Sequence, residues 1–365
     1  MAVNTSFSAG PKKLSGIEAA RGVAAVMVVF YHIARHLNLN FGTLPWRGVL
    51  QFGHAGVDFF FVLSGFIIFF VHSKDVGHPA RLWTYFERRF TRIFPLFWVA
   101  LAVWLGLAYL SSTQVFPSVG AILQNATLLP FGNEVGVAWT LEHEILFYLI
   151  FAIAIVHRRA GTAAFVLWLC FVLGSWASGQ EYGGLPVLAR LASTYSLEFF
   201  FGMLSAYLVN VLSTQLIYLS LALGVSGFVG VALAENVGLF NSYASSGRVA
   251  YGVSSMLIVI GIAGANLTGR LAAPRILSEL GTASYSIYLL HLAVVGVIYK
   301  LLTILALQSA VPLNLLYPIL VAATIASCII ISRLVEYPLM NWVRRSILVR
   351  AADQKTPIPE STVGK

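Results

Sequence analysis

Two residues of the first apolar stretch have side chains that suit group-transfer chemistry. Arg21 carries a permanent cation, and His32 is a ring that accepts a proton near neutral pH. On a helix, residues eleven positions apart project from nearly the same face, about 16 Å from each other along the axis. A long ligand with phosphates at one end and a reactive group at the other would fit such a face. Alternatively, Arg21 pairs with Glu18 and His32 forms a hydrogen bond at the membrane interface.

Two carboxylates are expected near His32. Asp58 would lie about 10 Å below the outer surface and Glu144 about 9 Å below it, which is close to the expected depth of His32. Because a charge at the bilayer centre costs about 2.5–3.5 kcal/mol or more, each needs a partner. Asp58 or Glu144 could orient the His32 ring and stabilise its protonated form. A role in helix packing is the alternative for both.

A cluster of arginines follows the second apolar stretch, in the segment Arg88-Arg89-Phe90-Thr91-Arg92. Arg89 and Arg92 are three residues apart and therefore share a helix face, where two guanidinium groups could hold phosphates. Topology anchoring is the alternative role. Further along the chain, His291 is expected about a third of the way up from the cytoplasm, level with Arg21.

The composition shows which kind of chain must position these residues. Of 365 residues, 58% are hydrophobic and only 10% are charged, and the mean hydropathy is +0.83. Soluble domains carry roughly 25% charge, so a soluble enzyme, a disordered protein and a nucleic-acid binder are excluded. The two cysteines, Cys170 and Cys328, lie in apolar runs and indicate neither a disulfide nor a metal site.

The chain is therefore expected to be an all-α polytopic membrane protein with about ten transmembrane helices. A helix needs roughly 20 apolar residues to cross a bilayer. Candidate spans are 14–36, 51–72, 93–111, 138–157, 162–180, 190–212, 215–235, 246–265, 283–307 and 314–336. Residues 113–137 read as a polar loop. We expect an integral-membrane domain over 1–342 and a polar, disordered tail over 343–365.

The distribution of basic residues predicts that both termini are cytoplasmic. With ten spans and the N-terminus inside, sixteen of the 23 lysines and arginines fall in cytoplasmic segments, four in outer loops and three within spans. This excess on one side follows the positive-inside rule and agrees with the net charge of +9.

Taken together, these segments resemble the family-3 integral-membrane acyltransferases, which O-acylate the sugars of surface glycans. The resemblance covers the whole chain in order and rests on six motifs. These are Leu14-Ser15-Gly16 through Arg21-Gly22 to His32, Gly56 to Phe66, Arg89-Phe90-Thr91-Arg92, Trp139-Thr140-Leu141 to Glu144 and Phe147-Tyr148, Tyr285 to His291, and Glu336-Tyr337-Pro338. One departure is Glu18, where many members carry Asp or Gln. Another is the chain's end soon after the tenth span, without the extracytoplasmic domain of longer members.

The resemblance implies an enzyme that takes an acyl group, acetyl above all, from cytoplasmic acetyl-CoA and transfers it to a glycan hydroxyl at the outer side. Arg21 and His32 would correspond to the family's Arg/His pair, and Arg89 and Arg92 to its Arg-x-x-Arg motif. We expect His32 to act as general base, with Asp58 or Glu144 as its partner. His291 is grouped with the arginines as a donor-binding residue. An acyl-histidine intermediate is a rival route.

The remaining expectations concern location and partners. The resemblance places the chain in the bacterial inner membrane, with an exopolysaccharide, an O-antigen or a lipid-linked sugar as acceptor and the polysaccharide assembly machinery as a further partner. No metal and no nucleic acid is expected. The competing class is a proton-coupled transporter or flippase of a glycan or lipid, in which His32, Asp58 and Glu144 relay protons. A non-catalytic scaffold for polysaccharide assembly is a third possibility.

Overall fold

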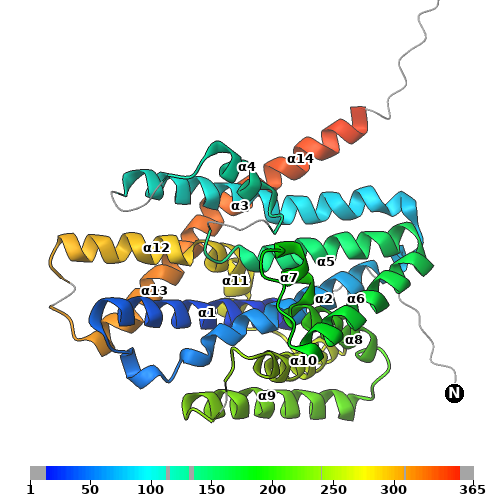
Figure 1. The fold of residues 1–365 in the computed structure, drawn as a ribbon, viewed down its shortest axis with the longest axis horizontal. Coiled ribbons are helices and arrows are strands. Elements are labelled where there is room, and N and C mark those ends of the chain that lie inside the picture. The colour runs from blue at the N-terminus through cyan, green and yellow to red at the C-terminus, as the bar shows by residue number, and fades with distance from the viewer. Residues whose placement is uncertain (1–13, 112–115, 131–134, 240, 308–309, 354–365) are drawn as a thin grey trace, which may run out of the picture.

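A computed structural model describes residues 14–111, 116–130, 135–239, 241–307 and 310–353, and these ranges contain helices but no strand (Figure 1). The long helices are α1 (Ser15–Phe41), α2 (Gly56–His72), α3 (Leu82–Leu110), α5 (Trp139–Val156), α6 (Arg158–Ser178), α9 (Thr214–Asn236), α10 (Ser245–Leu267), α12 (Ser284–Ile304), α13 (Leu313–Ile331) and α14 (Tyr337–Asp353). Shorter ones are α4 (Val119–Thr127), α7 (Pro186–Ala192), α8 (Tyr195–Leu208) and α11 (Arg275–Thr282). The prediction of an all-α polytopic membrane protein is confirmed.

The predicted span 190–212 is wrong as a single helix. Nine helical segments of the described chain are long and apolar enough to cross a membrane, and this segment is not among them. It is divided between α7 and α8, because the chain is extended at Ser193. The 14 residues of α8 reach only about 21 Å, less than the roughly 30 Å of a bilayer core. Instead, α8 packs along α2 inside the bundle.

Two other segments differ from the sequence-based expectation. The predicted span 93–111 is only the second part of α3, which begins at Leu82 and therefore carries the arginine cluster on the same continuous helix. The chain is also helical beyond 342, since α14 continues to Asp353 and so enters the segment expected to be a disordered tail. Residues 354–365 lie outside the described residues.

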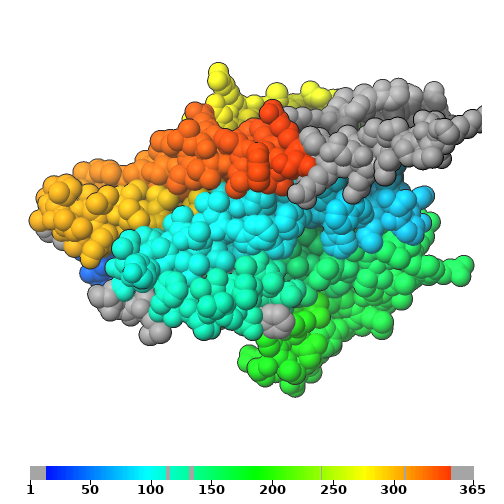
Figure 2. Space-filling model, turned by 90° about the horizontal axis from the view of Figure 1, so that it is seen from above, coloured from blue at the N-terminus to red at the C-terminus, as the bar shows by residue number. Residues whose placement is uncertain are grey.

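Helix α1 occupies the middle of the bundle and contacts α2, α10, α11, α12 and α13 (Figure 1). Its small residues Gly16, Ala19 and Gly22 are buried and allow this close approach. Helix α3 lies on the surface beside the C-terminal helices (Figure 2). This arrangement surrounds the Arg21 and His32 side chains with other helices.

Glycine makes the contact between α2 and α8 possible. A Cβ atom on Gly202 would overlap the backbone oxygen of Val62, and one on Gly65 would overlap the backbone oxygen of Phe199. Both obstacles are backbone atoms and cannot rotate away. The two helices therefore pack backbone to backbone, as small residues allow in membranes.

Gly202→Ala is expected to lower the thermal stability of the detergent-solubilised protein, because overpacking costs about 1–3 kcal/mol. The matched control is Gly230→Ala on α9, where an added Cβ meets nothing within 4 Å. Thermal unfolding of both variants is the measurement. Equal unfolding midpoints in the two variants would show that α2 and α8 can move apart without loss of stability.

Candidate active site

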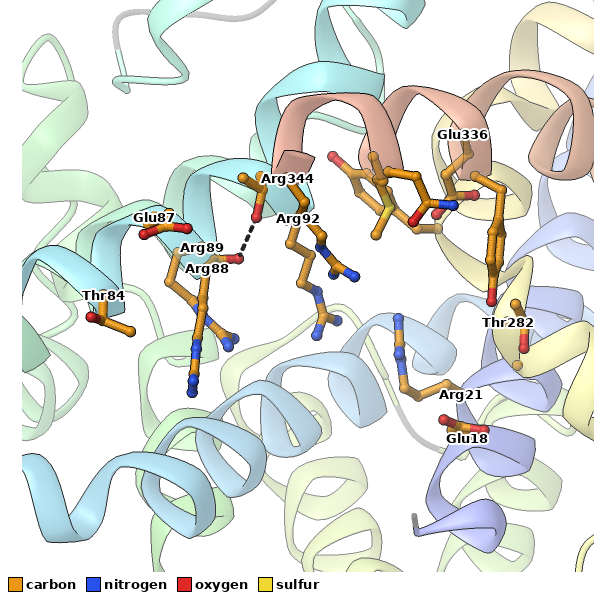
Figure 3. Close-up of a pocket in the computed structure, with 16 residues that line it drawn as sticks. Glu18, Arg21, Thr84, Glu87, Arg88, Arg89, Arg92, Thr282, Glu336 and Arg344 are labelled. Carbon is orange, nitrogen blue, oxygen red and sulfur yellow. Dashed lines mark hydrogen bonds between the residues drawn. The ribbon is translucent and has the colours of Figure 1, made fainter. Parts of the chain in front are cut away.

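A cavity of about 880 Å³ opens where α1, α3 and α12 begin (Figure 3). Its lining is rich in charge of both signs. The cations are Arg21, Arg88, Arg89, Arg92 and Arg344, and the anions are Glu18, Glu87 and Glu336. We call it the arginine cavity. The excess of guanidinium groups favours a ligand with several negative charges.

The arginine side chains converge on one space. Figure 3 shows Arg89 and Arg92 reaching down from α3, and Arg21 reaching up toward them from α1. Arg21 experiences the charges of Arg92, Glu144 and Glu336. Like charges that face each other are unfavourable unless an anion lies between them, so this arrangement is suited to phosphate groups.

A π-helical turn positions Glu336 at the edge of the arginine cavity. The turn spans Ser332–Glu336, between α13 and α14. Glu336 Oε2 accepts hydrogen bonds from Ser286 Oγ at 2.6 Å and Ser332 Oγ at 2.8 Å. These bonds fix the carboxylate, and single π-turns inside helices often occur at functional sites.

A second, smaller cavity of about 60 Å³ continues inward from the first. The two share Arg21, Arg92 and Tyr285 in their linings. The inner cavity ends among Glu144, Thr140 and Tyr288. A narrow extension of this kind suits the thin arm of a ligand whose charged end fills the larger space.

Two hydroxyl groups hold Glu144 in the inner cavity. Its Oε1 accepts hydrogen bonds from Ser64 Oγ at 3.1 Å and from the Tyr148 hydroxyl. These donors satisfy a carboxylate that would otherwise be costly in the membrane. Glu144 and Arg21 line the same inner cavity, whereas His32 does not, so the prediction that Glu144 lies level with His32 is wrong. The depth was misjudged because α5 does not begin at the surface: Val137 and Ala138, just before it, are buried.

His32 lies against His291. Their ring centroids are 5.1 Å apart, which joins α1 to α12. Lower on the same two helices, Arg21 of α1 and Tyr285 of α12 line both cavities together. The predicted shared face of Arg21 and His32 is therefore the face of α1 that meets α12. His32 itself lines neither cavity. The Tyr288 ring, whose centroid is 6.3 Å from that of His291, connects the end of the inner cavity to the histidine pair.

The prediction that His291 lies level with Arg21 is wrong. A Cβ atom on Gly22 would lie 2.6 Å from the backbone nitrogen of Gly281, which sets Gly281 level with Gly22. Because α1 and α12 run together from there, ten further residues bring His32 and His291 to the same depth. The sequence did not indicate that α12 starts deeper than α1. It does so because α11, which precedes α12, packs against the first turns of α1.

Hydrogen bonds fix the tautomer of His291. Its Nδ1 lies 2.8 Å from the backbone oxygen of Tyr288, and a carbonyl can only accept, so Nδ1 carries the proton. In the neutral ring, Nε2 then has a free lone pair. This atom is buried and has no hydrogen-bond partner among the described residues. His291 is therefore a proton acceptor beside His32.

Asp58 does not contact His32, contrary to the prediction. It is buried where α2 packs against α8, near Glu198 of α8 and the charged or polar side chains of His54 and Arg248. The error arises because α2 begins only after a short 3₁₀ helix, Gln51–Ala55, that packs against α1. The contact between α2 and α8 then determines where Asp58 lies.

Sequence reasoning missed a second polar cluster, formed by the 3₁₀ helix Gln51–Ala55, the end of α9 and the first part of α10. His54 Nε2 lies 3.0 Å from both Glu235 Oε1 and Ser242 Oγ, and Glu235 Oε2 accepts from Tyr251 at 2.7 Å. Both contacts of His54 use the same ring nitrogen, so the three residues do not form a catalytic triad, which needs both nitrogens. Glu235, an acidic residue at the end of the predicted span 215–235, could have indicated this cluster.

The described residues contain no group of three or more side chains suited to hold a metal ion. The described residues instead form the arginine cavity, its narrow inner extension and a histidine pair in which His32 is half-buried and His291 is buried. In a membrane protein, such an arrangement suits a long anionic ligand that enters from one end of the bundle.

Comparison with known proteins identifies the family. Residues 14–333 match the model of the acyltransferase domain of acyltransferase family 3, and the chain belongs to this family of membrane acyltransferases. It is 29% identical over 262 residues to the exopolysaccharide production protein ExoZ of Rhizobium meliloti, covering 68% of this chain and 78% of that protein. No solved structure matches the chain.

Two further relatives show the range of proteins that the chain resembles. It is 27% identical over 306 residues to the putative membrane-bound transacylase BcsY of Komagataeibacter xylinus, covering 75% of this chain and 71% of that protein. It is 28% identical over 213 residues to the O-acetyl transferase of Shigella phage Sf6, covering 52% of this chain and 61% of that protein.

Proposed function

We propose that the protein transfers an acetyl group from acetyl-CoA to a hydroxyl of an exopolysaccharide, an O-antigen or a lipid-linked sugar, across the bacterial inner membrane. The observation that supports this most is the continuity of the arginine cavity with the inner cavity, which ends near the His32–His291 pair. Membership of an acyltransferase family and the similarity to ExoZ and to a phage O-acetyl transferase support the reaction class.

The donor would bind with its phosphates in the arginine cavity. Arg89 and Arg92 would hold them, because guanidinium groups form paired hydrogen bonds with phosphate oxygens. Arg21 stands at the junction of the two cavities and would guide the pantetheine arm inward. The basic residues concentrated at this end of the bundle would place it in the cytoplasm, where acetyl-CoA is made.

His32 would act as the general base. The acceptor oxygen attacks the thioester carbonyl carbon while its proton passes to the imidazole. The carbon–sulfur bond then breaks, and the CoA thiolate recovers the proton from the imidazolium. His291, whose Nε2 lone pair is buried beside His32, would help to stabilise that imidazolium. Glu144 would act on the donor side, as an anion that holds Arg21 in place.

Transfer of radiolabel tests the proposal. The purified protein, in proteoliposomes, is given acetyl-CoA labelled in the acetyl group together with glycan acceptors. We expect label in an alkali-labile ester on the glycan. A protein that moves glycan without any label transfer would be a transporter or flippase, and the proposal would fail. Label trapped on the protein before acceptor is added would instead indicate an acyl-histidine intermediate.

A further inference from the structure

A third cavity, of about 820 Å³, lies between α3 and α12 and faces away from the arginine cavity. Its lining residues are mostly apolar. Helix α3 and the residue after it contribute Ala100, Trp104, Leu107, Leu110 and Ser111. The turn before α5 contributes Val135, Gly136 and Val137. Helix α12 contributes Leu289, Leu290, Leu292, Ala293, Gly296, Val297, Lys300 and Leu301. We call it the α3–α12 groove.

A single stripe of α12 forms one wall of the groove. Leu289, Ala293, Gly296 and Lys300 follow one another at spacings of three and four residues, which places them on one helix face. Gly296 faces open space in this wall, because an added Cβ there would meet nothing within 4 Å. Lys300 is the single charged residue of this lining, and it lies at the end of α12 remote from the arginine cavity.

The groove ends next to the inner cavity. Val137 lines the groove, and its backbone oxygen accepts hydrogen bonds from Thr140 Oγ1 at 2.9 Å and from the Tyr288 hydroxyl at 3.4 Å. Thr140 and Tyr288 both line the inner cavity, and their hydroxyl groups are 2.8 Å apart. The two spaces are thus separated by one layer of side chains. Leu290 of the groove is also the immediate neighbour of His291.

We propose that the α3–α12 groove binds the hydrocarbon chain of a lipid-linked acceptor, with Lys300 against its phosphate. This inference rests on the proposed acyl transfer and names its substrate class. An apolar lining offers few partners to sugar hydroxyls, whereas it suits one hydrocarbon chain. One cation at the end of such a groove complements a lipid phosphate.

Binding in the groove would also explain how the acceptor finds the histidine pair. Lys300 lies nine residues from His291, or about 14 Å along α12. With the phosphate held at Lys300, the sugar attached to it starts about 14 Å from His291, which replaces an encounter in solution by a local one. A diacyl phospholipid carries two chains, so a long-chain isoprenoid phosphate fits a single groove better.

Photolabelling tests the inference without any acetyl donor. The probe is a polyprenyl phosphate bearing a benzophenone on its hydrocarbon chain, added to the full-length protein in detergent micelles. We expect crosslinks within α3 and α12. Unlabelled polyprenyl diphosphate should displace the probe, whereas the same concentration of phosphatidylglycerol should not.

Three variants make the test specific. Gly296→Phe fills the groove and should abolish the crosslinks, and Lys300→Gln should raise the concentration for half-displacement about 10-fold, as expected for a lost charged hydrogen bond. Gly106→Phe on α3 is the matched control, since its Cβ also meets nothing within 4 Å and Gly106 is outside the groove lining. Retained acetyl-CoA binding verifies that each variant is folded.

Several outcomes would overturn the inference. Equal crosslinking of Gly296→Phe and the unaltered protein would show that the groove is not the binding site. Equal displacement by phosphatidylglycerol would reduce it to a site for ordinary bilayer lipid. Crosslinks at the half-exposed Tyr243, whose ring stacks on that of His54 at 4.7 Å, would place the acceptor on the second polar cluster instead. Each result can occur while acetyl transfer to soluble glycans succeeds, so failure here is distinguishable from failure of the proposed function.

Discussion

Replacing His32 with alanine is expected to lower kcat for acyl transfer by about 10²–10⁴-fold, the range for loss of a general base. The Kd for acetyl-CoA should stay within about twofold of the unaltered value, because His32 lines neither donor cavity. Single-turnover transfer of labelled acetyl groups measures the first quantity, and equilibrium binding of labelled CoA measures the second.

His291→Ala is the matched variant, because the two rings lie 5.1 Å apart on neighbouring helices. We expect a smaller loss of kcat than in His32→Ala, since His291 acts through its neighbour. Normal turnover in His32→Ala would refute the assignment of the base. A larger loss in His291→Ala than in His32→Ala would exchange the roles of the two histidines.

The double variant Arg89→Gln, Arg92→Gln is expected to raise the KM for acetyl-CoA at least about 10²-fold. Each lost hydrogen bond to a charged group is worth about 1.5–3 kcal/mol, and 1.4 kcal/mol corresponds to a factor of ten. At saturating donor, kcat should change little, because these side chains contact the phosphates and not the thioester. Steady-state kinetics with varied acetyl-CoA provides the measurement.

Acetyl-pantetheine supplies the control for this variant, because it carries the thioester without the nucleotide and pyrophosphate of CoA. Its KM should be the same in the double variant and in the unaltered protein. Arg81→Gln is the control for basic charge at the start of α3, since Arg81 is exposed and absent from the cavity lining. Unchanged affinity for acetyl-CoA in the double variant would leave Arg89 and Arg92 as topology anchors.

The periodicity of the sequence predicts which residues share a helix face but not how helices are offset. Arg21 and His32 lie on the α1 face that meets α12, as their spacing indicates. Arg89 and Arg92 line one cavity, as the three-residue interval indicates. Both predictions concern a single helix, where geometry follows from 3.6 residues per turn.

Depth in the membrane could not be predicted equally well. Counting from span ends predicts the wrong depth for His291 and Glu144, and it does not predict that Asp58 packs against α8 and not against His32. The close contact between Gly22 and Gly281, the buried turn before α5 and the short helix α8 decide their positions. These are contacts between segments distant in the chain, and one sequence does not contain that information in its local pattern.

The central claim is that acetyl-CoA spans the arginine cavity and the inner cavity, with its thioester toward the histidine pair. An experimental structure of the protein with bound acetyl-CoA tests this most directly. We predict phosphate oxygens within hydrogen-bond distance of Arg89 and Arg92, the pantetheine arm passing Arg21, and the thioester carbonyl beyond Glu144 near Tyr288. Density for CoA at another surface, with the arginine cavity empty, would contradict the account.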